Sequence, residues 1–249
     1  MAPYTVLISG ANRGIGKGLL ELYLARPNHV VIAANRNPDH ETSKALADLP
    51  KGPGSSLIVV KVDATAASDA AAAVKQLEEV HGIRHLDLVI ANAGISYCWP
   101  KVSEVKREDM QAHIEPNVYG LVWLYQATLP LLVKAANPKW VSVGSCSAYL
   151  TVRLEQLDMP NAAYAPSKVI VHWLTKAIHR EEPALVAFPL DPGWVQTDLG
   201  NTGAHAFGHE SAPLKVSDVC AGTLKVIDAA TRETHGGRLI RYDGVELPW

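Results

Sequence analysis

The sequence is poor in cysteine, and its three cysteines (Cys98, Cys146 and Cys220) lie far apart. Such spacing matches neither a disulfide framework nor a set of metal ligands, so we expect a reducing compartment and no metal. The formal net charge is only −2. Without an excess of basic residues, a nucleic acid is not an expected partner.

Long hydrophobic runs are also missing. No stretch of about 18 uncharged apolar residues occurs, so no membrane-spanning helix is expected. The opening "MAPYTVLISG" leads almost directly into a strand, without the basic region and apolar core of a secretory signal. These absences predict a cytoplasmic protein that has no membrane partner.

Short β-branched runs alternate with longer helical patterns, which is typical of βαβ units. We expect an α/β fold: a single Rossmann-type doubly wound domain over residues 1–249, with a seven-stranded parallel sheet flanked by helices. The expected strands are 5–9, 29–34, 57–62, 86–91, 139–143, 184–190 and 238–241, and the expected helices are 16–26, 40–48, 66–81, 108–136, 162–182 and 217–230. Segment 198–213 is rich in glycine and lacks clear periodicity, so it is expected to be a substrate loop or merely a mobile connection.

The stretch "VLISGANRGIGKGLL" places three glycines between the first strand and the first helix. Glycines there let the backbone turn tightly and approach a pyrophosphate, which the helix N-terminus then stabilises. Because a strand precedes the turn and a helix follows it, the motif predicts a dinucleotide site. Its expected contacts are Gly10, Asn12, Arg13, Gly14, Ile15 and Gly16.

The second strand shows which dinucleotide to expect. NAD sites usually carry an acidic residue at its tip, which accepts a hydrogen bond from the ribose 2′-hydroxyl. Here the strand ends in Asn35 and Arg36, and Arg13 stands in the glycine turn. Two arginines would neutralise a 2′-phosphate, so NADP(H) is the expected cofactor. Asp39, beyond the strand, is interpreted as a helix N-cap.

In "NAAYAPSKVI", Tyr164 and Lys168 stand four residues apart on a predicted helix and so share one face. A free tyrosine has a pKa of about 10, and a neighbouring ammonium lowers it. Such a phenol can give its proton to an alkoxide that forms as a hydride arrives. An arbitrary pair of this kind is usually a buried tyrosine beside a surface lysine, but the nucleotide-binding turn earlier in the chain favours chemistry.

Taken in order, these motifs resemble the short-chain dehydrogenase/reductase family over nearly the whole chain. The resemblance implies that Tyr164 is the acid, and that Lys168 tunes it and holds the nicotinamide ribose. It also implies that Ser145, in "KWVSVGSCSAYL", orients the substrate carbonyl, with Ser147 as a competing candidate. Asn117, in "HIEPNVYG", would hold a water in a proton relay.

The same resemblance implies further cofactor contacts, at Asp63, Ala64, Asn92, Ala93, Gly94, Tyr164, Lys168, Pro192, Gly193, Val195 and Thr197. It also implies a homo-oligomer, dimer or tetramer, formed through helices 108–136 and 162–182. Burial within one subunit would produce much the same apolar stripe on these helices.

Two features depart from the family pattern. Pro116 stands inside a predicted helix, where we expect a kink beside Asn117. Ser145 and Tyr164 are also further apart than is usual in the family, so residues 147–161 are expected to bulge over the site entrance. Tyr149, Arg153 and Leu154 would then touch substrate, although an ordinary surface excursion is an equal alternative.

The stretches "YDGVELPW" and "DPGWVQTDLG" resemble the norsolorinic-acid-ketoreductase-like branch of fungal secondary metabolism. This resemblance implies a small-molecule aromatic or bulky ketone that is reduced to an alcohol. Two alternatives stay open: a cyclase, isomerase or dehydratase that uses the same pocket, and a dinucleotide sensor without turnover. Side chains at expected pocket positions would suit an aromatic ketone, or would simply fill the core: Ile95, Tyr97, Trp99, Trp194 and Phe207.

Overall fold

One sheet organises the chain in the computed structural model, which describes residues 2–151 and 159–249. Its strands lie in the order β3-β2-β1-β4-β5-β6-β7-β8. Strands β1 to β7 pair in parallel, and β8 pairs antiparallel with β7. The bounds are β1 Tyr4–Ser9, β2 His29–Asn35, β3 Ser56–Lys61, β4 Leu88–Ala91, β5 Lys139–Val143, β6 Val186–Asp191, β7 Leu239–Arg241 and β8 Glu246–Leu247.

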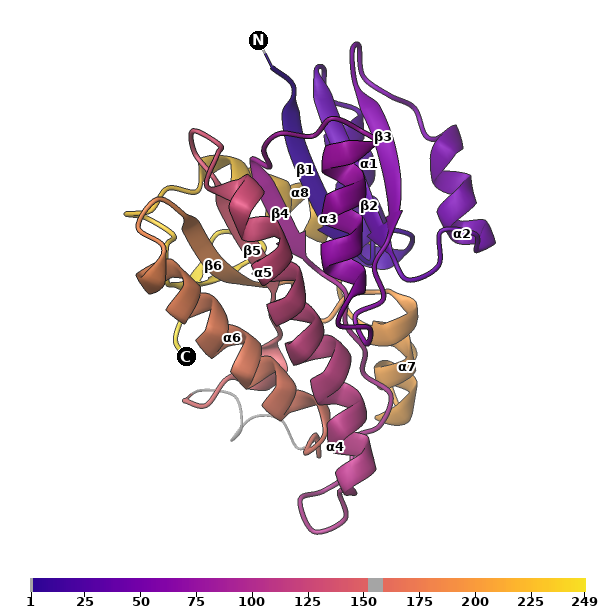
Figure 1. Cartoon of the computed structure of the whole chain (residues 1–249). Helices are drawn as coiled ribbons and strands as arrows, with labels where there is room; N and C mark the ends of the chain where they lie inside the picture. The colour runs from indigo at the N-terminus through magenta and orange to yellow at the C-terminus, as the bar shows by residue number, and fades with distance from the viewer. Residues whose placement is uncertain (1, 152–158) are drawn as a thin grey trace.

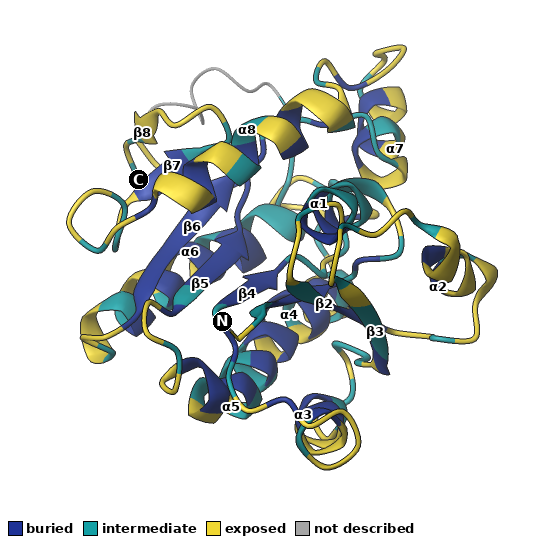
Figure 2. Ribbon diagram, turned by 90° about the horizontal axis from the view of Figure 1, so that it is seen from above, coloured by how far each residue is buried: buried dark blue, intermediate teal, exposed yellow. Residues whose placement is uncertain are grey.

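Helices cover both faces of this sheet (Figures 1 and 2). One face carries α1 and α8, and the other carries α3, α5 and α6. The bounds are α1 Gly14–Leu24, α2 Glu41–Lys44, α3 Asp69–Glu79, α4 Arg107–Ile114, α5 Gly120–Leu132, α6 Tyr164–Glu181, α7 Asp198–Ala206 and α8 Val216–Ala229. Three short segments complete the set: the 3-10 helices η1 Ala45–Asp48 and η3 Cys146–Ala148, and the π-helix η2 Glu115–Tyr119. The predicted doubly wound α/β fold is confirmed, with one additional edge strand.

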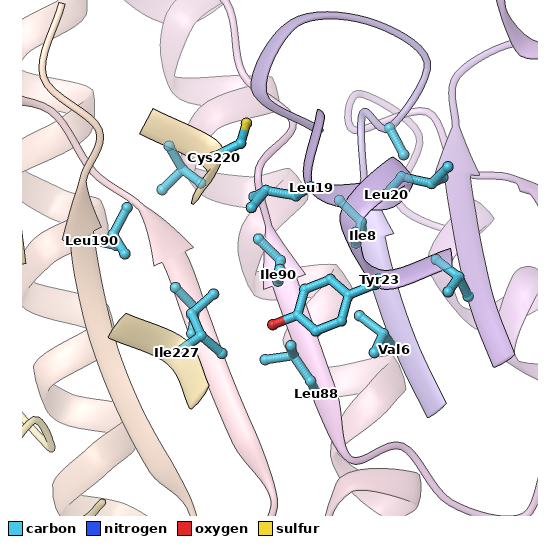
Figure 3. Close-up of a cluster of buried hydrophobic side chains, with 14 of the residues drawn as sticks. Val6, Ile8, Leu19, Leu20, Tyr23, Leu88, Ile90, Leu190, Cys220 and Ile227 are labelled. Atoms are coloured by element: carbon cyan, nitrogen blue, oxygen red, sulfur yellow. The ribbon is translucent and has the colours of Figure 1, made fainter. Parts of the chain in front are cut away.

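Two hydrophobic clusters fill the space between sheet and helices, because the strands are apolar on both faces. Figure 3 shows the first cluster, in which Ile8 and Ile90 of the sheet meet Leu19 of α1 and Ile227 of α8. The second packs Trp140 of β5 and its neighbours against α3, α5 and α6. The two clusters hold the strands in position, and the candidate site lies at the carboxyl ends of these strands.

The order of the strands creates a crevice between the carboxyl ends of the central strands β1 and β4. The chain runs outward from β1 through β2 to β3, then returns to pair β4 with the other side of β1. Helices therefore leave the carboxyl ends of β1 and β4 toward opposite faces. Ligands of open α/β sheets bind at such a switch point.

The prediction of an unstructured segment over 198–213 is wrong for its first half, which forms α7. The Thr197 hydroxyl caps this helix by accepting a hydrogen bond from the Gly200 amide at 3.0 Å. A Cβ on Gly200 would lie 1.9 Å from the Val195 carbonyl oxygen, so glycine here permits close packing of the first turn. Composition indicated a loop, but the Thr197 cap and the close packing that Gly200 permits favour a helix.

Two smaller differences concern helix ends. The helix expected over 108–136 is divided into α4 and α5 by η2, a wider π-helical turn that contains Pro116 at the position of the predicted kink. Asp39 is not a helix N-cap. His40 caps α2, because its ring nitrogen accepts from the Thr42 amide at 3.3 Å.

Within the described residues, no helix is long and apolar enough to cross a membrane.

Candidate active site

A cavity of about 1920 Å³ lies along the carboxyl ends of the central strands. It is roughly twice the upper size of an ordinary small-molecule site, about 1,000 Å³, so it has room for two ligands side by side. Nearly all the predicted contacts line it, from both sides of the crevice. They are Gly10, Asn12, Arg13, Gly14, Ile15, Arg36, Asp63, Ala64, Asn92, Ala93, Gly94, Ser145, Tyr164, Lys168, Pro192, Gly193, Val195 and Thr197.

The glycine turn forms a cradle at the N-terminus of α1. Gly10 and Gly14 have φ of +64° and +53°, a region that glycine adopts far more readily than other residues. A Cβ on Gly16 would lie 2.3 Å from the Gly10 carbonyl oxygen, so glycine at this position lets the first turn of α1 pack against the end of β1. Gly16 does not line the cavity. Bare backbone at a helix N-terminus is what a pyrophosphate requires, so these residues fit a dinucleotide.

Asn92 holds this cradle in place. Its amide nitrogen donates to the carbonyl oxygens of Ser9 and Gly10, at 2.8 and 3.1 Å. The Ser9 hydroxyl in turn accepts from the backbone amides of Asn92 and Ala93, each at 3.0 Å. The end of β4 is therefore tied to the end of β1 across the switch point.

At the tip of β2 no carboxylate faces the cavity. Asn35 is fully buried, and its side-chain oxygen accepts from the Ala11 amide at 2.9 Å. Arg36 follows it, exposed and lining the cavity. Arg13 pairs with Asp198 at 3.3 Å on the surface, which makes Arg36 the stronger candidate for an anion contact.

Among the cavity residues at this end that were not predicted from the sequence are His40 and Thr42. The Thr42 hydroxyl accepts from the Asn12 side-chain amide at 2.7 Å, and His40 contacts the same hydroxyl at 2.9 Å. Both residues line the cavity. Thr42 lies on the short helix α2 and His40 is its N-cap, and this stretch carries no motif that could have revealed their position.

Tyr164 begins α6, and Lys168 lies one turn further on with its Nζ 5.9 Å from the centre of the Tyr164 ring. Lys168 is buried and donates to the Val143 carbonyl oxygen at 2.9 Å. Burial lowers the pKa of this lysine to about 8. The helix thus brings the predicted pair together at the cavity wall.

The expectation that the ammonium lowers the tyrosine pKa is not met in the protein chain itself. Burial raises the pKa of Tyr164 above its ordinary value, and the hydrogen bond with the Ser145 side chain only partly opposes this. Desolvation disfavours the phenolate more than the neighbouring groups favour it. Tyr164 is therefore a neutral phenol that holds its proton.

Ser145 stands where β5 gives way to η3. Its hydroxyl is hydrogen-bonded to Tyr164 and accepts from the Ser147 backbone amide at 3.1 Å. Ser147 thus supports Ser145 through its main chain, and this geometry favours Ser145 over Ser147 as the group that meets a carbonyl.

Asn117 lies behind the cavity wall in η2. Its side chain accepts from the Ile95 amide at 2.8 Å and donates to the Ile95 carbonyl at 3.0 Å and the Ser167 hydroxyl at 3.0 Å. A second, internal cavity of about 20 Å³ touches both Asn117 and Lys168. About one water molecule fits such a volume, which agrees with the predicted relay.

Aromatic side chains surround the other end of the main cavity. Trp99 packs edge-on against Phe207 with ring centres 5.7 Å apart, and Trp194 lies nearby, its ring nitrogen donating to the Gly200 carbonyl at 2.9 Å. All three line the cavity, as does Ile95. Tyr97 does not: it is about half exposed and stacks on His113.

The segment after Ser145 is described only in part. Tyr149 is buried, lines the cavity, and donates a hydrogen bond from its hydroxyl to Asp191. Arg153 and Leu154, the other two residues expected to touch substrate, lie outside the described residues. Among the described side chains, no three His, Cys, Asp or Glu residues gather as metal ligands would.

The fold and this site define a nicotinamide-dinucleotide oxidoreductase of the doubly wound class. The family described as short chain dehydrogenase matches residues 4–205. The norsolorinic acid ketoreductase of Dothistroma septosporum is 42% identical over 248 residues, which cover 98% of this chain and 92% of that protein. The norsolorinic acid ketoreductase of Aspergillus parasiticus is 40% identical over 245 residues, 98% of this chain and 90% of that one.

Solved structures agree. The NADPH-bound carbonyl reductase from chicken fatty liver superposes with a TM-score of 0.84 and 26% identity, covering 100% of both chains. The carbonyl reductase Sniffer of D. melanogaster reaches a TM-score of 0.85 at 24% identity, covering 99% and 100%. The chain belongs to the short-chain dehydrogenase/reductase family, in the norsolorinic-acid-ketoreductase-like branch.

Proposed function

We propose that this protein reduces the ketone of a bulky aromatic secondary metabolite to an alcohol, with NADPH as the hydride donor. The observation that supports this most is the grouping of Tyr164, Ser145 and Lys168 on one wall of a cavity that also contains the glycine cradle. The bound cofactor would supply a hydride to the carbonyl carbon. The protein side chains manage the oxygen and its proton.

Each side chain has a distinct task in this proposal. Ser145 donates a hydrogen bond to the carbonyl oxygen and stabilises the charge that develops there. Tyr164, a neutral phenol, gives its proton to the same oxygen. Lys168, one helical turn away, stabilises the phenolate that is left and contacts the nicotinamide ribose, while Asn117 keeps a water within reach of the lysine so that a proton can return.

The substrate class rests on the aromatic end of the cavity and on the relatives. Trp99, Trp194 and Phe207 offer flat apolar surfaces to a ring system. Two relatives that match over nearly their full length are named norsolorinic acid ketoreductase. A panel of hydroxylated aryl ketones, assayed for ketone-dependent NADPH oxidation and alcohol formation, tests the proposal; the absence of turnover with every member would contradict it.

The cofactor preference gives a separate prediction. Replacing Arg36 by alanine removes the cation at the tip of β2, so we expect the KM for NADPH to rise about 10- to 100-fold, the value of one or two charge-assisted hydrogen bonds. The KM for NADH should barely change. Lys44→Ala is the matched control, because Lys44 is exposed and pairs with Asp39 at 3.8 Å outside the cavity. Equal effects on both cofactors would refute the assignment of Arg36.

We also propose that the protein forms a homo-oligomer through α5 and α6, which lie side by side in Figure 1. Trp173 of α6 is 64% exposed and Tyr119, just before α5, is 53% exposed. Exposing such large apolar side chains to water is unfavourable in a monomer and is typical of an interaction surface. Trp173→Glu should shift the mass measured by light scattering from the oligomer to the monomer. A wild-type monomer would rule this interface out.

The protein is further proposed to act in the cytoplasm. Its three cysteines, all within the described residues, form no disulfide, which fits a reducing compartment.

A further inference from the structure

Buried behind the catalytic wall is a histidine that the proposed reaction does not use. His172 lies on α6, four residues after Lys168, and is only 3% exposed. Burial, together with the charge of Lys168, lowers its pKa to about 3. The ring is therefore neutral at working pH, with one nitrogen free to accept a hydrogen bond.

That acceptor meets the backbone of the catalytic serine. The Ser145 amide donates to Nε2 of His172 at 3.3 Å, in a buried position. The residue before the serine is glycine, and a Cβ on Gly144 would lie only 2.3 Å from the same nitrogen. The close approach of the ring to the end of β5 thus depends on Gly144.

The other side of the His172 ring is closed by Trp249. The two rings meet edge to face with centres 6.2 Å apart. Lys176, one turn after His172, places its Nζ 4.1 Å from the centre of the Trp249 ring, within cation–π distance. Figure 1 shows the C-terminal end of the chain beside α6.

Trp249 also reaches the segment that follows the serine. Its carbonyl oxygen accepts from the Thr151 hydroxyl at 2.6 Å, and Thr151 lies six residues after Ser145. The serine is therefore restrained twice: through its own amide by His172, and through Thr151 by the residue that packs on His172.

We infer that His172 and Trp249 form a positioning latch, which holds Ser145 at the distance from the substrate carbonyl that the reaction needs. Neither residue is a catalytic residue, because both act through Ser145. The inference rests on the proposed role of Ser145. It assigns a role in turnover to Trp249, a residue that does not line the cavity.

The test compares paired variants with purified protein, NADPH and an aryl ketone that the wild-type enzyme reduces. His172→Leu leaves the buried Ser145 amide without an acceptor, whereas His172→Gln retains one. We expect kcat to fall about 30-fold in the leucine variant, less than the roughly 100- to 1,000-fold loss when an oxyanion donor is removed, because Ser145 is displaced and not lost. In the glutamine variant kcat should recover to within a few-fold of wild type. Trp249→Ala should lower kcat by about 10-fold and Trp249→Phe much less.

Cofactor affinity distinguishes positioning from general damage. The Kd for NADPH, measured by fluorescence, should stay within twofold of wild type in all four variants. Val245→Ala, an exposed side chain next to β8, is the matched control and should turn over normally.

Turnover by the wild-type enzyme tests the proposed function. The comparison of the His172 and Trp249 variants with wild type tests the latch. The latch is refuted if His172→Leu and His172→Gln turn over equally, or if Trp249→Ala retains the wild-type kcat. It is also refuted if NADPH affinity falls in parallel with kcat.

Discussion

Replacing Tyr164 by phenylalanine is expected to lower kcat/KM for ketone reduction about 1,000-fold, in the middle of the range for a lost general acid. The change removes one oxygen from a half-buried side chain at the start of α6, so the fold should persist. The Kd for NADPH should stay near the wild-type value, because the ring itself is kept. Initial rates and dinucleotide fluorescence measure the two quantities.

The matched control is Tyr97→Phe. Tyr97 also lies near the catalytic wall, on the far side of His113, but it does not line the cavity. This variant should retain turnover within a few-fold. Full activity in Tyr164→Phe, or an equal loss in both variants, would remove the phenol from the mechanism.

Lys168→Met should also eliminate measurable turnover, yet stabilise the protein at neutral pH. The folded-state pKa of Lys168 is about 8, against an ordinary value of 10.5, because its ammonium is buried. At 1.36 kcal/mol per pKa unit, the charged lysine costs about 3 kcal/mol of stability below pH 8. Methionine avoids this cost but loses one hydrogen bond, to Val143, worth about 2 kcal/mol because its donor is charged. We expect a net gain of about 1 kcal/mol in the free energy of unfolding at pH 7.

The stability gain of Lys168→Met should depend on pH, because the charge of Lys168 does. Between pH 8 and 10.5 the unfolded chain binds more protons than the folded wild type, so wild-type stability rises across that window. The advantage of Lys168→Met should therefore shrink as the pH approaches 10.5. Urea unfolding at pH 7 and pH 10, without dinucleotide, measures it.

Lys225→Met, at an exposed position on α8, is the control and should show neither effect. A Lys168→Met variant that is less stable than wild type at pH 7 would contradict the account of the buried ammonium.

Much of the site could be predicted from the sequence because its motifs are local. Gly10, Gly14 and Gly16 occupy a turn whose backbone only glycine fits, and Tyr164 and Lys168 share a helix face through spacing alone. The order of strands then brings these segments to one edge of the sheet. The conformation of the glycine turn and the shared helix face depend on neighbouring residues only, so they can be predicted without knowledge of tertiary contacts.

The predictions that failed depend on contacts between distant segments. Helix α7 packs against the distant Trp99, whose ring would lie 3.5 Å from a Cβ on Gly203, although its own composition indicates a loop. The pKa of Tyr164 rises because folding buries the phenol, a cost that the spacing of Tyr164 and Lys168 does not show. The contacts of Trp249 with Thr151 and His172, which no prediction covered, also join segments far apart in the sequence.

The central claim is that hydride and proton reach a ketone by separate routes, the proton through Tyr164. Mass spectrometry of the alcohol formed from NADPH deuterated at C4, on the transferred side of the ring, tests it directly. We expect one deuterium at the former carbonyl carbon for each NADPH oxidised, and a drop of about 1,000-fold in this labelled product with Tyr164→Phe. An unlabelled product, or one formed without NADPH oxidation, would contradict it.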